Sequence, residues 1–315
     1  CAMVWRTTLA AVCAGALAAG AQPAPYKAEA GPWPVLAAAG LELLDAARGK
    51  RLPARVTYPD GTGPFPVVLF SHGYRGSKDH YQPLAAHWAG HGYVVVQVDH
   101  SDSQALPPPR ADFEDWLGRV QDVHFLIDAL DDWTRAVPGL RARMDPARLG
   151  VGGHSYGAQT AQLLGGAVIR NGTSLAHPAV RAALLISGQG RGQLLGDRSW
   201  DAFTNPMMAL TGTRDDSDRT GNPWTWRTEP YAFAPPGDKY LVVIEGAYHG
   251  FGGIGGGRMA GPSSGPPNAD HVAYVRSAST AFWDAYLGDD GAALRELVSA
   301  GLSAASGGAV SVRHK

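Results

Sequence analysis

The segment around Ser155 constrains the fold more than any other part of the chain. The apolar residues 149–152 favour a strand, the sequence Gly153-His154-Ser155-Tyr156-Gly157 follows, and residues 158–164 favour a helix. A glycine on each side of the serine lets a strand and a helix approach each other closely across a sharp turn. The pattern therefore predicts a strained strand–turn–helix unit that exposes the hydroxyl of Ser155 above a sheet.

Strands and helices are predicted to alternate along most of the chain. Short apolar runs predict buried strands, and longer runs with apolar residues three and four positions apart predict helices. The strands are expected at residues 41–44, 54–58, 67–70, 93–98, 149–152, 182–186, 207–210 and 240–244, and the longer helices at 81–89, 111–133, 158–164 and 269–286. This alternation predicts an α/β fold with a mostly parallel central sheet and helices on both faces.

The N-terminal segment has the features of a secretion signal. Arg6 is followed by an apolar run over residues 9–19 and by Ala-Gly-Ala at residues 19–21, which fits a signal-peptidase site. The apolar run is too short to cross a bilayer as a helix. We therefore expect residues 1–21 to be removed as a signal peptide and the mature protein to be secreted or periplasmic in a bacterium.

Both cysteines lie in this N-terminal segment. Cys1 and Cys13 would be lost with it, so the mature chain is expected to have no disulfide, no thiol nucleophile and no cysteine metal site. The alternative, a lipoprotein anchored through Cys13, is disfavoured by the bulky Val12 directly before it.

Composition and charge limit the domain organisation and the partners. A chain of 315 residues with 45% hydrophobic side chains can form one large core. We expect residues 22–40 to be a linker, residues 41–290 to form the folded domain, and residues 291–315 to form a C-terminal helix and a flexible tail. The formal net charge of −1 gives no electrostatic reason to expect nucleic acid or a membrane as a partner. We expect a monomer without an integral membrane segment.

A serine hydroxyl becomes an effective nucleophile only beside a base, and the base needs a carboxylate to orient it. Suitable residues follow two later strands. Asp215 comes after the strand at 207–210, with Asp216 as an open alternative, and His249 comes just after the strand at 240–244. These loops leave the sheet at the same edge as Ser155, so the order Ser, Asp, His predicts a catalytic triad.

The segment Phe70-Ser71-His72-Gly73-Tyr74 follows another predicted strand at this edge. Acyl transfer passes through an oxyanion that needs backbone N–H donors, each contributing about 2.7–4 kcal/mol. We expect these donors to be the N–H groups of Tyr74 and of Tyr156, which follows the nucleophile. His72 is expected to brace the loop.

These motifs resemble one branch of the serine α/β-hydrolases, which contains the platelet-activating-factor acetylhydrolases and the predicted dienelactone hydrolases. Cutinase-like polyester hydrolases and chlorophyllases are similar in the same places. The resemblance extends over residues 41–290 and is carried by residues 45–48, 66–74, 90–93, 98–100, 153–157, 211–217 and 246–249. It implies an α/β-hydrolase fold without a substantial lid domain.

The resemblance also implies roles for individual residues. Ser155 would be the nucleophile, Asp215 the acid and His249 the base, with Tyr74 and Tyr156 as oxyanion donors. True dienelactone hydrolases use a cysteine nucleophile, so that activity is not implied. Cutinase-like polyester hydrolases usually carry a C-terminal disulfide and a methionine after the serine, whereas this chain has neither.

The rim of the cleft is expected to come from loops. Residues 187–206 are short and polar and predict no amphipathic helix that could act as a lid. Trp224, Trp226 and Phe251 are the candidate substrate-binding side chains, with ordinary core packing as the alternative for each.

No cofactor or metal site is predicted. His80, His87 and His91 lie near one helix, but no carboxylate or cysteine joins them at ligand spacing.

Taken together, the motifs predict a serine carboxylic-ester hydrolase that forms an acyl-enzyme on short-chain or aromatic esters. The alternatives are a cutinase-like polyester hydrolase that acts on a polymeric ester and, from another class, a non-catalytic binding protein with the same fold.

Overall fold

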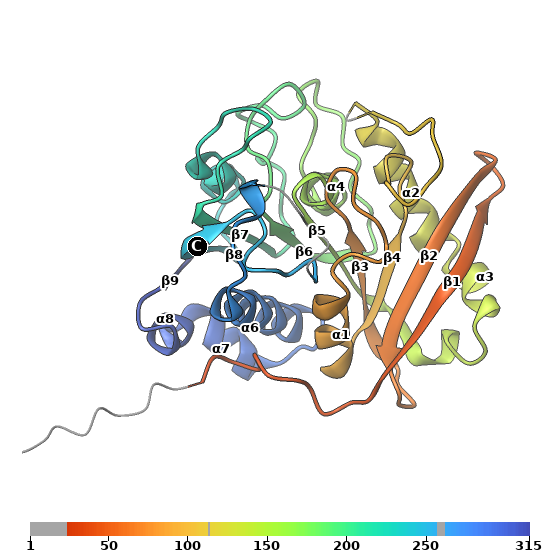
Figure 1. Ribbon diagram of the computed structural model, residues 1–315, viewed down its shortest axis with the longest axis horizontal. Coiled ribbons are helices and arrows are strands. Elements are labelled where there is room, and N and C mark those ends of the chain that lie inside the picture. The colour runs from red at the N-terminus through yellow and green to blue at the C-terminus, as the bar shows by residue number, and fades with distance from the viewer. Residues whose placement is uncertain (1–23, 113, 257–261) are drawn as a thin grey trace, which may run out of the picture.

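A nine-stranded sheet organises the part of the protein that the computed structural model describes, residues 24–112, 114–256 and 262–315 (Figure 1). The strand order is β1-β2-β4-β3-β5-β6-β7-β8-β9. The strands are β1 (Val35–Asp45), β2 (Lys50–Pro59), β3 (Phe65–Ser71), β4 (Val94–Val98), β5 (Met144–His154), β6 (Val180–Ile186), β7 (Met207–Arg214), β8 (Lys239–Tyr248) and β9 (Val310–His314). The six strands from β4 to β8 pair in parallel, whereas β1, β2 and β9 are antiparallel to their neighbours. The predicted fold class is confirmed.

Helices cover both faces of this sheet. They are α1 (Gln82–Gly90), α2 (Trp116–Asp128), α3 (Leu130–Trp133), α4 (Tyr156–Gly165), α5 (Glu229–Phe233), α6 (Ala269–Tyr286), α7 (Gly291–Val298) and α8 (Gly301–Ala305). α2 and α4 pack on one face, and α1 and α6 pack on the other. No helix among the described residues is long and apolar enough to cross a membrane.

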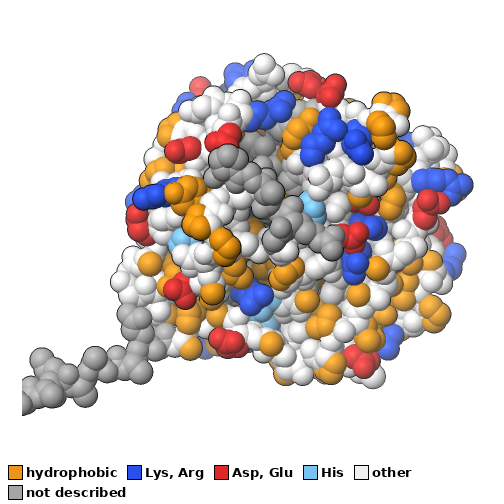
Figure 2. Space-filling view, in the orientation of Figure 1, with side chains coloured by type: hydrophobic (Ala, Val, Ile, Leu, Met, Phe, Trp, Pro, Cys, Tyr) orange, Lys and Arg blue, Asp and Glu red, His pale blue; other side chains and the backbone are white. Residues whose placement is uncertain are grey.

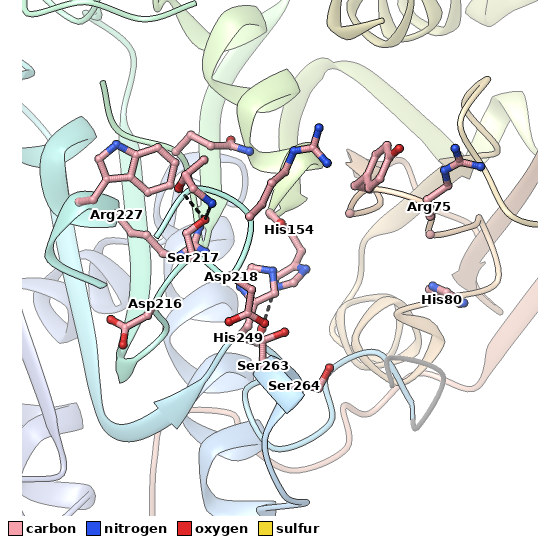
Figure 3. A pocket seen from close by; sticks show the side chains of 18 of the residues that line it. Arg75, His80, His154, Asp216, Ser217, Asp218, Arg227, His249, Ser263 and Ser264 are labelled. Atoms are coloured by element: carbon pink, nitrogen blue, oxygen red, sulfur yellow. Dashed lines mark hydrogen bonds between the residues drawn. The ribbon is translucent and has the colours of Figure 1, made fainter. Parts of the chain in front are cut away.

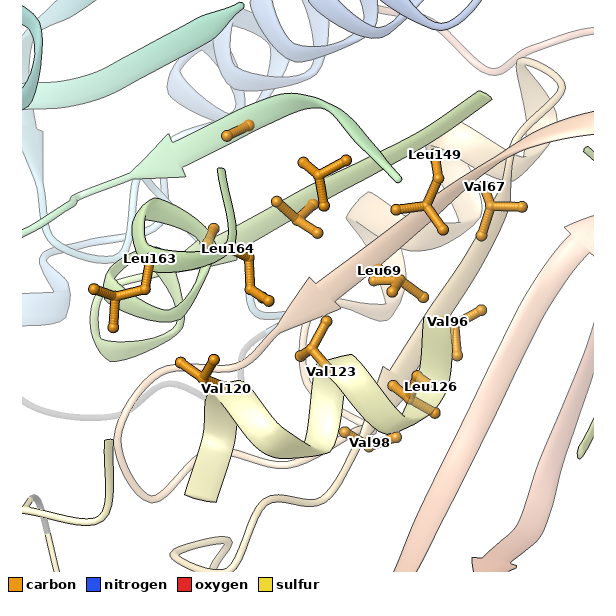
Figure 4. Packing of buried hydrophobic residues seen from close by; sticks show 14 of the residues in the cluster. Val67, Leu69, Val96, Val98, Val120, Val123, Leu126, Leu149, Leu163 and Leu164 are labelled. Carbon is orange, nitrogen blue, oxygen red and sulfur yellow. The ribbon is translucent and has the colours of Figure 1, made fainter. Parts of the chain in front are cut away.

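The periodicity of α2 explains how it packs. Asp115 caps the helix by accepting the N–H of Gly118, and Val120, Val123 and Leu126 then lie buried on one side. Figure 4 shows these three side chains facing residues of the central strands. Burying each such side chain contributes about 1.5–3 kcal/mol, so this stripe fixes the helix against the sheet.

The helix expected over residues 111–133 is shorter and interrupted. α2 begins at Trp116, and Ala129 leaves the helical conformation before the short helix α3 begins. The apolar spacing continues across Ala129, which is why the sequence pattern did not reveal the break.

The linker predicted at residues 22–40 is wrong in its last part. β1 begins at Val35 and pairs with β2 from Val35 opposite Pro59 to Asp45 opposite Lys50. The side chains of its first half are mostly exposed, so this part of β1 is stabilised mainly by backbone pairing along β2, and its run of alanines and a glycine gave no strand signal. The predicted signal peptide at residues 1–21, with both cysteines, lies outside the described residues.

The flexible tail predicted within residues 291–315 is also wrong. Residues after α7 form α8 and then β9, which pairs antiparallel with β8 and buries Val310 completely. The tail is rich in Ser, Ala and Gly, which favours disorder locally. The exposed edge of β8 supplies the backbone partners that order it.

Charged side chains of both signs are interspersed with hydrophobic ones on the face seen in Figure 2. This mixed surface agrees with the formal net charge of −1. It offers no broad basic patch on this face that would attract a polyanion.

The turn between β5 and α4 requires glycine on both sides of Ser155. A Cβ on Gly153 would lie 2.2 Å from the carbonyl carbon of Gly157, and a Cβ on Gly157 would lie 1.9 Å from the carbonyl oxygen of Ser71 at the end of β3. Ser155 itself has φ 55°, a conformation that non-glycine residues rarely adopt. The end of β3 and the start of α4 are therefore in direct backbone contact.

Gly157→Ala should destabilise the fold strongly because its methyl group would meet backbone that cannot yield. We expect a loss of more than about 3 kcal/mol in the free energy of unfolding, measured by urea denaturation. Gly192→Ala is the control, since a Cβ there meets nothing within 4 Å. Equal stability of the two variants would contradict the close approach.

Candidate active site

Ser155 lies at the turn between β5 and α4 and lines a pocket at the carboxyl ends of the parallel strands. Its backbone N–H donates to the carbonyl of Ile186 at the end of β6, at 2.9 Å. This bond ties the strained turn to the neighbouring strand. His249 lines the same pocket, as the sequence order predicted.

Asp215 and His249 contact each other directly. His249 Nδ1 lies 2.7 Å from Asp215 Oδ1, and the hydroxyl of Thr211 donates to Asp215 Oδ2 at 3.0 Å. Asp215 is fully buried, whereas Asp216 is exposed and accepts the backbone N–H of Trp224 at 2.7 Å. Of the two predicted candidates, the structure brings Asp215 to the histidine. A proton on Nδ1 shared with Asp215 leaves Nε2 as the basic nitrogen.

A buried arginine stabilises the charge on Asp215. Arg227, from the short 3₁₀ helix at Trp224–Thr228, has its Nε 3.0 Å from Asp215 Oδ1 and also donates to the carbonyls of Asp215 and Ser187. Burial by itself raises the pKa of Asp215, but Arg227 and His249 outweigh it and hold that pKa below its usual value. The carboxylate of Asp215 therefore stays ionised beside His249. The Ser187 hydroxyl, 2.8 Å from His249 Nδ1, adds a further polar contact.

His154, directly before the nucleophile, connects two loops of the site. Tyr81 accepts the N–H of Gly73 at 3.4 Å and lies 2.8 Å from His154 Nδ1, while His154 Nε2 donates to the carbonyl of His249 at 2.8 Å. Burial, together with nearby His249, lowers the pKa of His154 well below its usual value. The neutral ring can therefore accept from Tyr81 at one nitrogen and donate at the other.

A second buried ion pair supports the loop that holds Tyr74. Arg119 on α2 pairs with Asp102 at 2.8 Å and donates to the carbonyls of His72 at 2.6 Å and Gly73 at 3.2 Å. Asp102 in turn accepts the N–H of Arg75 at 2.8 Å. The pair is almost completely buried, so removing either partner would leave an uncompensated charge.

Tyr74 lines the pocket and Tyr156 is the first residue of α4. Their rings meet edge to face with centroids 6.0 Å apart. Both residues therefore adjoin Ser155, and their backbone N–H groups remain the predicted oxyanion donors.

A second Ser–His–Asp array lies beneath this loop. Ser71 Oγ is 2.8 Å from His100 Nε2, and His100 Nδ1 is 2.8 Å from Asp122 Oδ2. All three side chains are buried, none lines the pocket, and Lys50 also pairs with Asp122. A substrate has no access to this serine, so we assign the array a structural role.

The pocket has a volume of about 430 Å³. Figure 3 shows His249 and His154 at its centre, with Arg75 and His80 on one side and Asp216 and Ser217 on the other. Its described lining residues are Gly73, Tyr74, Arg75, Gly76, His80, Tyr81, Gln104, His154, Ser155, Gln189, Asp216, Ser217, Asp218, Arg219, Thr220, Trp226, Arg227, His249, Ser263 and Ser264. Residues 187–206 form turns and bends beside it and no helix.

The predicted substrate-binding residues separate into two groups. Trp226 lines the pocket, with its indole N–H bonded to the carbonyl of Arg191 at 2.8 Å. Trp224 is half-buried outside the described lining. The prediction for Phe251 is wrong, because its side chain is fully buried in the core against His154. This loop aromatic, two residues after His249, has packed inward.

Among the described residues, one cluster has the composition of a metal site. His124 and Asp128 on α2 and His177 place ligand atoms within 4.8 Å of one another, away from the pocket lining. His177 Nδ1 accepts the N–H of Ala179 at 3.1 Å, so its proton is on Nε2, which donates to Asp128 at 3.0 Å. That nitrogen cannot bind a metal in this hydrogen-bond arrangement.

The chain is similar in sequence to several known proteins. A family model described as Chlorophyllase matches residues 42–185. "Cutinase est2" of Thermobifida alba is 27% identical over 196 residues, covering 62% of this chain and 56% of that protein. A "Bis(hydroxyethyl) terephthalate hydrolase" of Streptomyces coelicolor is 26% identical over 198 residues, covering 62% and 54%. This chain thus spans little more than half the length of these relatives.

The solved structure of a ferulic acid esterase from Streptomyces cinnamoneus superposes with a TM-score of 0.63 at 19% identity. The match covers 89% of this chain and 96% of that one. At this identity the likeness establishes the architecture. The chain has the α/β-hydrolase fold.

Proposed function

We propose that the protein is a serine carboxylic-ester hydrolase that works through an acyl-enzyme. The observation that carries this proposal is the 2.7 Å contact between buried Asp215 and His249, in the pocket that Ser155 lines from its strained turn. A binding protein on this fold has no need for an ionised carboxylate aligned with a histidine beside a strained serine.

The chemistry follows from the positions of these groups. His249 Nε2 removes the proton of Ser155 as the serine oxygen attacks the ester carbonyl, while Asp215 holds the tautomer and stabilises the imidazolium. The N–H groups of Tyr74 and Tyr156 would stabilise the oxyanion. His249 then protonates the leaving alcohol and activates the water that releases the acid.

The composition of the pocket supports short-chain or aromatic esters as substrates. None of the described lining residues is aliphatic, and the apolar surface comes from the rings of Tyr74, Tyr81 and Trp226. Such rings can stack against an aromatic acid, but they offer no tunnel for a long alkyl chain.

Polyester hydrolysis is the second candidate, and the relatives favour it. Two of these relatives are named as a cutinase and as a bis(hydroxyethyl) terephthalate hydrolase. The absence of aliphatic side chains among the described lining residues argues against a large aliphatic polymer as the main substrate.

Two further proposals rest on the sequence motifs alone. The first places the protein in the branch of the platelet-activating-factor acetylhydrolases and predicted dienelactone hydrolases. The second is that the protein is exported from the cell.

Ser155→Ala should abolish hydrolysis of 4-nitrophenyl acetate without unfolding the protein. Removing the nucleophile of a serine protease lowers kcat about a million-fold, and we expect a loss of that order. A phosphonate ester should label the parent enzyme at Ser155 only, as checked by peptide mass spectrometry. Activity above about a hundredth of the parent, with normal circular dichroism, would refute the role of Ser155.

Asp215→Asn should lower kcat about ten-thousand-fold, because an amide orients the imidazole in the wrong tautomer. The matched variant Asp216→Asn keeps the oxygen that accepts the N–H of Trp224. Its kcat should fall by less than about tenfold, since substitutions of exposed residues usually have small effects. Steady-state kinetics of both variants, with unfolding curves as a control, provide the test. A reversed order would assign the acid to Asp216.

The acyl-length profile should be flat or falling. A pocket that buries the acyl chain gains about 0.8 kcal/mol, or nearly fourfold in kcat/KM, per methylene group. With no aliphatic lining described, 4-nitrophenyl butanoate should react at least as well as the octanoate. The rate should not jump when a triglyceride passes its solubility limit, because residues 187–206 supply no helical lid. A steep rise in kcat/KM with the length of the acyl chain would contradict a pocket without aliphatic lining.

A further inference from the structure

Two guanidinium groups converge on one aromatic ring in the pocket. The Cζ atoms of Arg75 and Arg219 lie 5.3 and 5.2 Å from the centroid of the Tyr74 ring, and all three residues line the pocket. The same ring packs against Tyr156, which directly follows Ser155. Two positive charges therefore adjoin the place where a bound ester would lie.

Arg75 occupies a conformation that favours glycine. Its φ is 58°, and a non-glycine residue in this region costs of order 1–3 kcal/mol. Asp102 holds it there by accepting the N–H of Arg75 at 2.8 Å, and Asp102 is fixed by its buried ion pair with Arg119. A charged side chain at a position where glycine would be unstrained points to a function for the guanidinium.

The charged side chains of the pocket lining are Arg75, Arg219, Arg227, Asp216 and Asp218. Arg227 is already bonded to Asp215, and Asp216 accepts the N–H of Trp224. Figure 3 places Arg75 and Asp216 on opposite sides of the pocket. Asp218 also lines the pocket, on the same loop as Arg219.

Like charges near one ring repel each other, and their attraction to the ring face offsets this repulsion only in part. An anionic group placed beside Tyr74 would interact favourably with both guanidiniums. Charge-assisted hydrogen bonds from arginine to a carboxylate or phosphate oxygen are among the stronger polar contacts in proteins.

We infer that Arg75 and Arg219 form a subsite for an anionic group of the substrate, so that the preferred substrates are small aromatic esters that carry a second, negatively charged group. This inference rests on the proposed ester hydrolase activity and specifies its substrate class. The group that binds would be a carboxylate or a phosphate, because both carry negative charge on two or more oxygens that can accept hydrogen bonds from arginine.

Matched esters test the subsite. Methyl 4-carboxybenzoate and methyl 4-carbamoylbenzoate have nearly the same size and differ in the charge of the group remote from the ester. The parent enzyme should favour the carboxylate by about tenfold in kcat/KM, the scale of one charge-assisted hydrogen bond. Methyl 4-(phosphonooxy)benzoate forms a third arm: a similar preference indicates a general anion subsite, and no preference restricts the subsite to carboxylates.

Arginine variants test which residues cause the preference for the carboxylate ester. Arg219→Gln and Arg75→Gln should each lower the carboxylate-to-carbamoyl ratio severalfold, and because the ratio is taken within one variant, a general loss of activity cancels. Arg198→Gln is the control, since its side chain is 91% exposed and lies outside the pocket lining. It removes the same charge from the chain and should keep the parent ratio. The preference should also weaken as salt rises to about 0.5 M, because the subsite is partly open to solvent.

Two results would overturn the inference, and they are distinguishable. If the parent enzyme hydrolyses the carbamoyl ester but shows a ratio near one, or if neither arginine variant changes the ratio, the anion subsite is wrong and the esterase stands. If none of the esters is hydrolysed and 4-nitrophenyl acetate is also stable, the proposed function itself fails.

Discussion

The close backbone contact between the turn at Ser155 and the end of β3 is the constraint on which the rest of the site depends. The Cα of Gly157 lies so near the carbonyl of Ser71 that no side chain fits between them. This contact places Ser155 beside the loop that carries Tyr74. The parallel strands β7 and β8 end at the same edge and bring Asp215 and His249 to it. The fold thus assembles one pocket from loops that are far apart in the chain.

Two buried ion pairs then hold these loops in place. The ion pair between Asp102 and Arg119 supports the Tyr74 loop. The ion pair between Asp215 and Arg227 holds Asp215 directly after β7. Breaking such a pair by removing one partner typically costs 3–5 kcal/mol, because the other charge stays buried. In both pairs the arginine also donates to backbone carbonyls, so charge burial serves to fix the path of the main chain. His154 connects the two sides through its bonds to Tyr81 and His249.

The relatives and the pocket describe different aspects of the protein. The relatives are named as ester hydrolases, and the proposed roles of Ser155, His249 and Asp215 agree with those names. Substrate choice depends on the loops above the sheet, which vary independently of the fold. In this chain those loops contribute arginines, hydroxyl groups and a few aromatic rings, and the proposed preference for small esters rests on them.

Local sequence patterns were sufficient to predict the parallel sheet, the turn at Ser155 and the residues that follow the later strands. These features depend on periodicity, glycine placement and chain order, all of which are visible in one dimension. The same patterns missed the first half of β1 and all of β9, because both depend on backbone pairing to a neighbouring strand and stand in segments rich in Ala, Gly or Ser.

The choice of Asp215 over Asp216 was favoured by spacing, but only the tertiary structure brings one of them to His249. Arg119, Arg227 and Ser187 were not anticipated at all, and Phe251 was assigned to the pocket when it packs in the core. Each of these outcomes depends on which remote segment a side chain meets. Sequence spacing determines the face on which a residue lies, whereas packing of distant elements determines its partner and its charge environment.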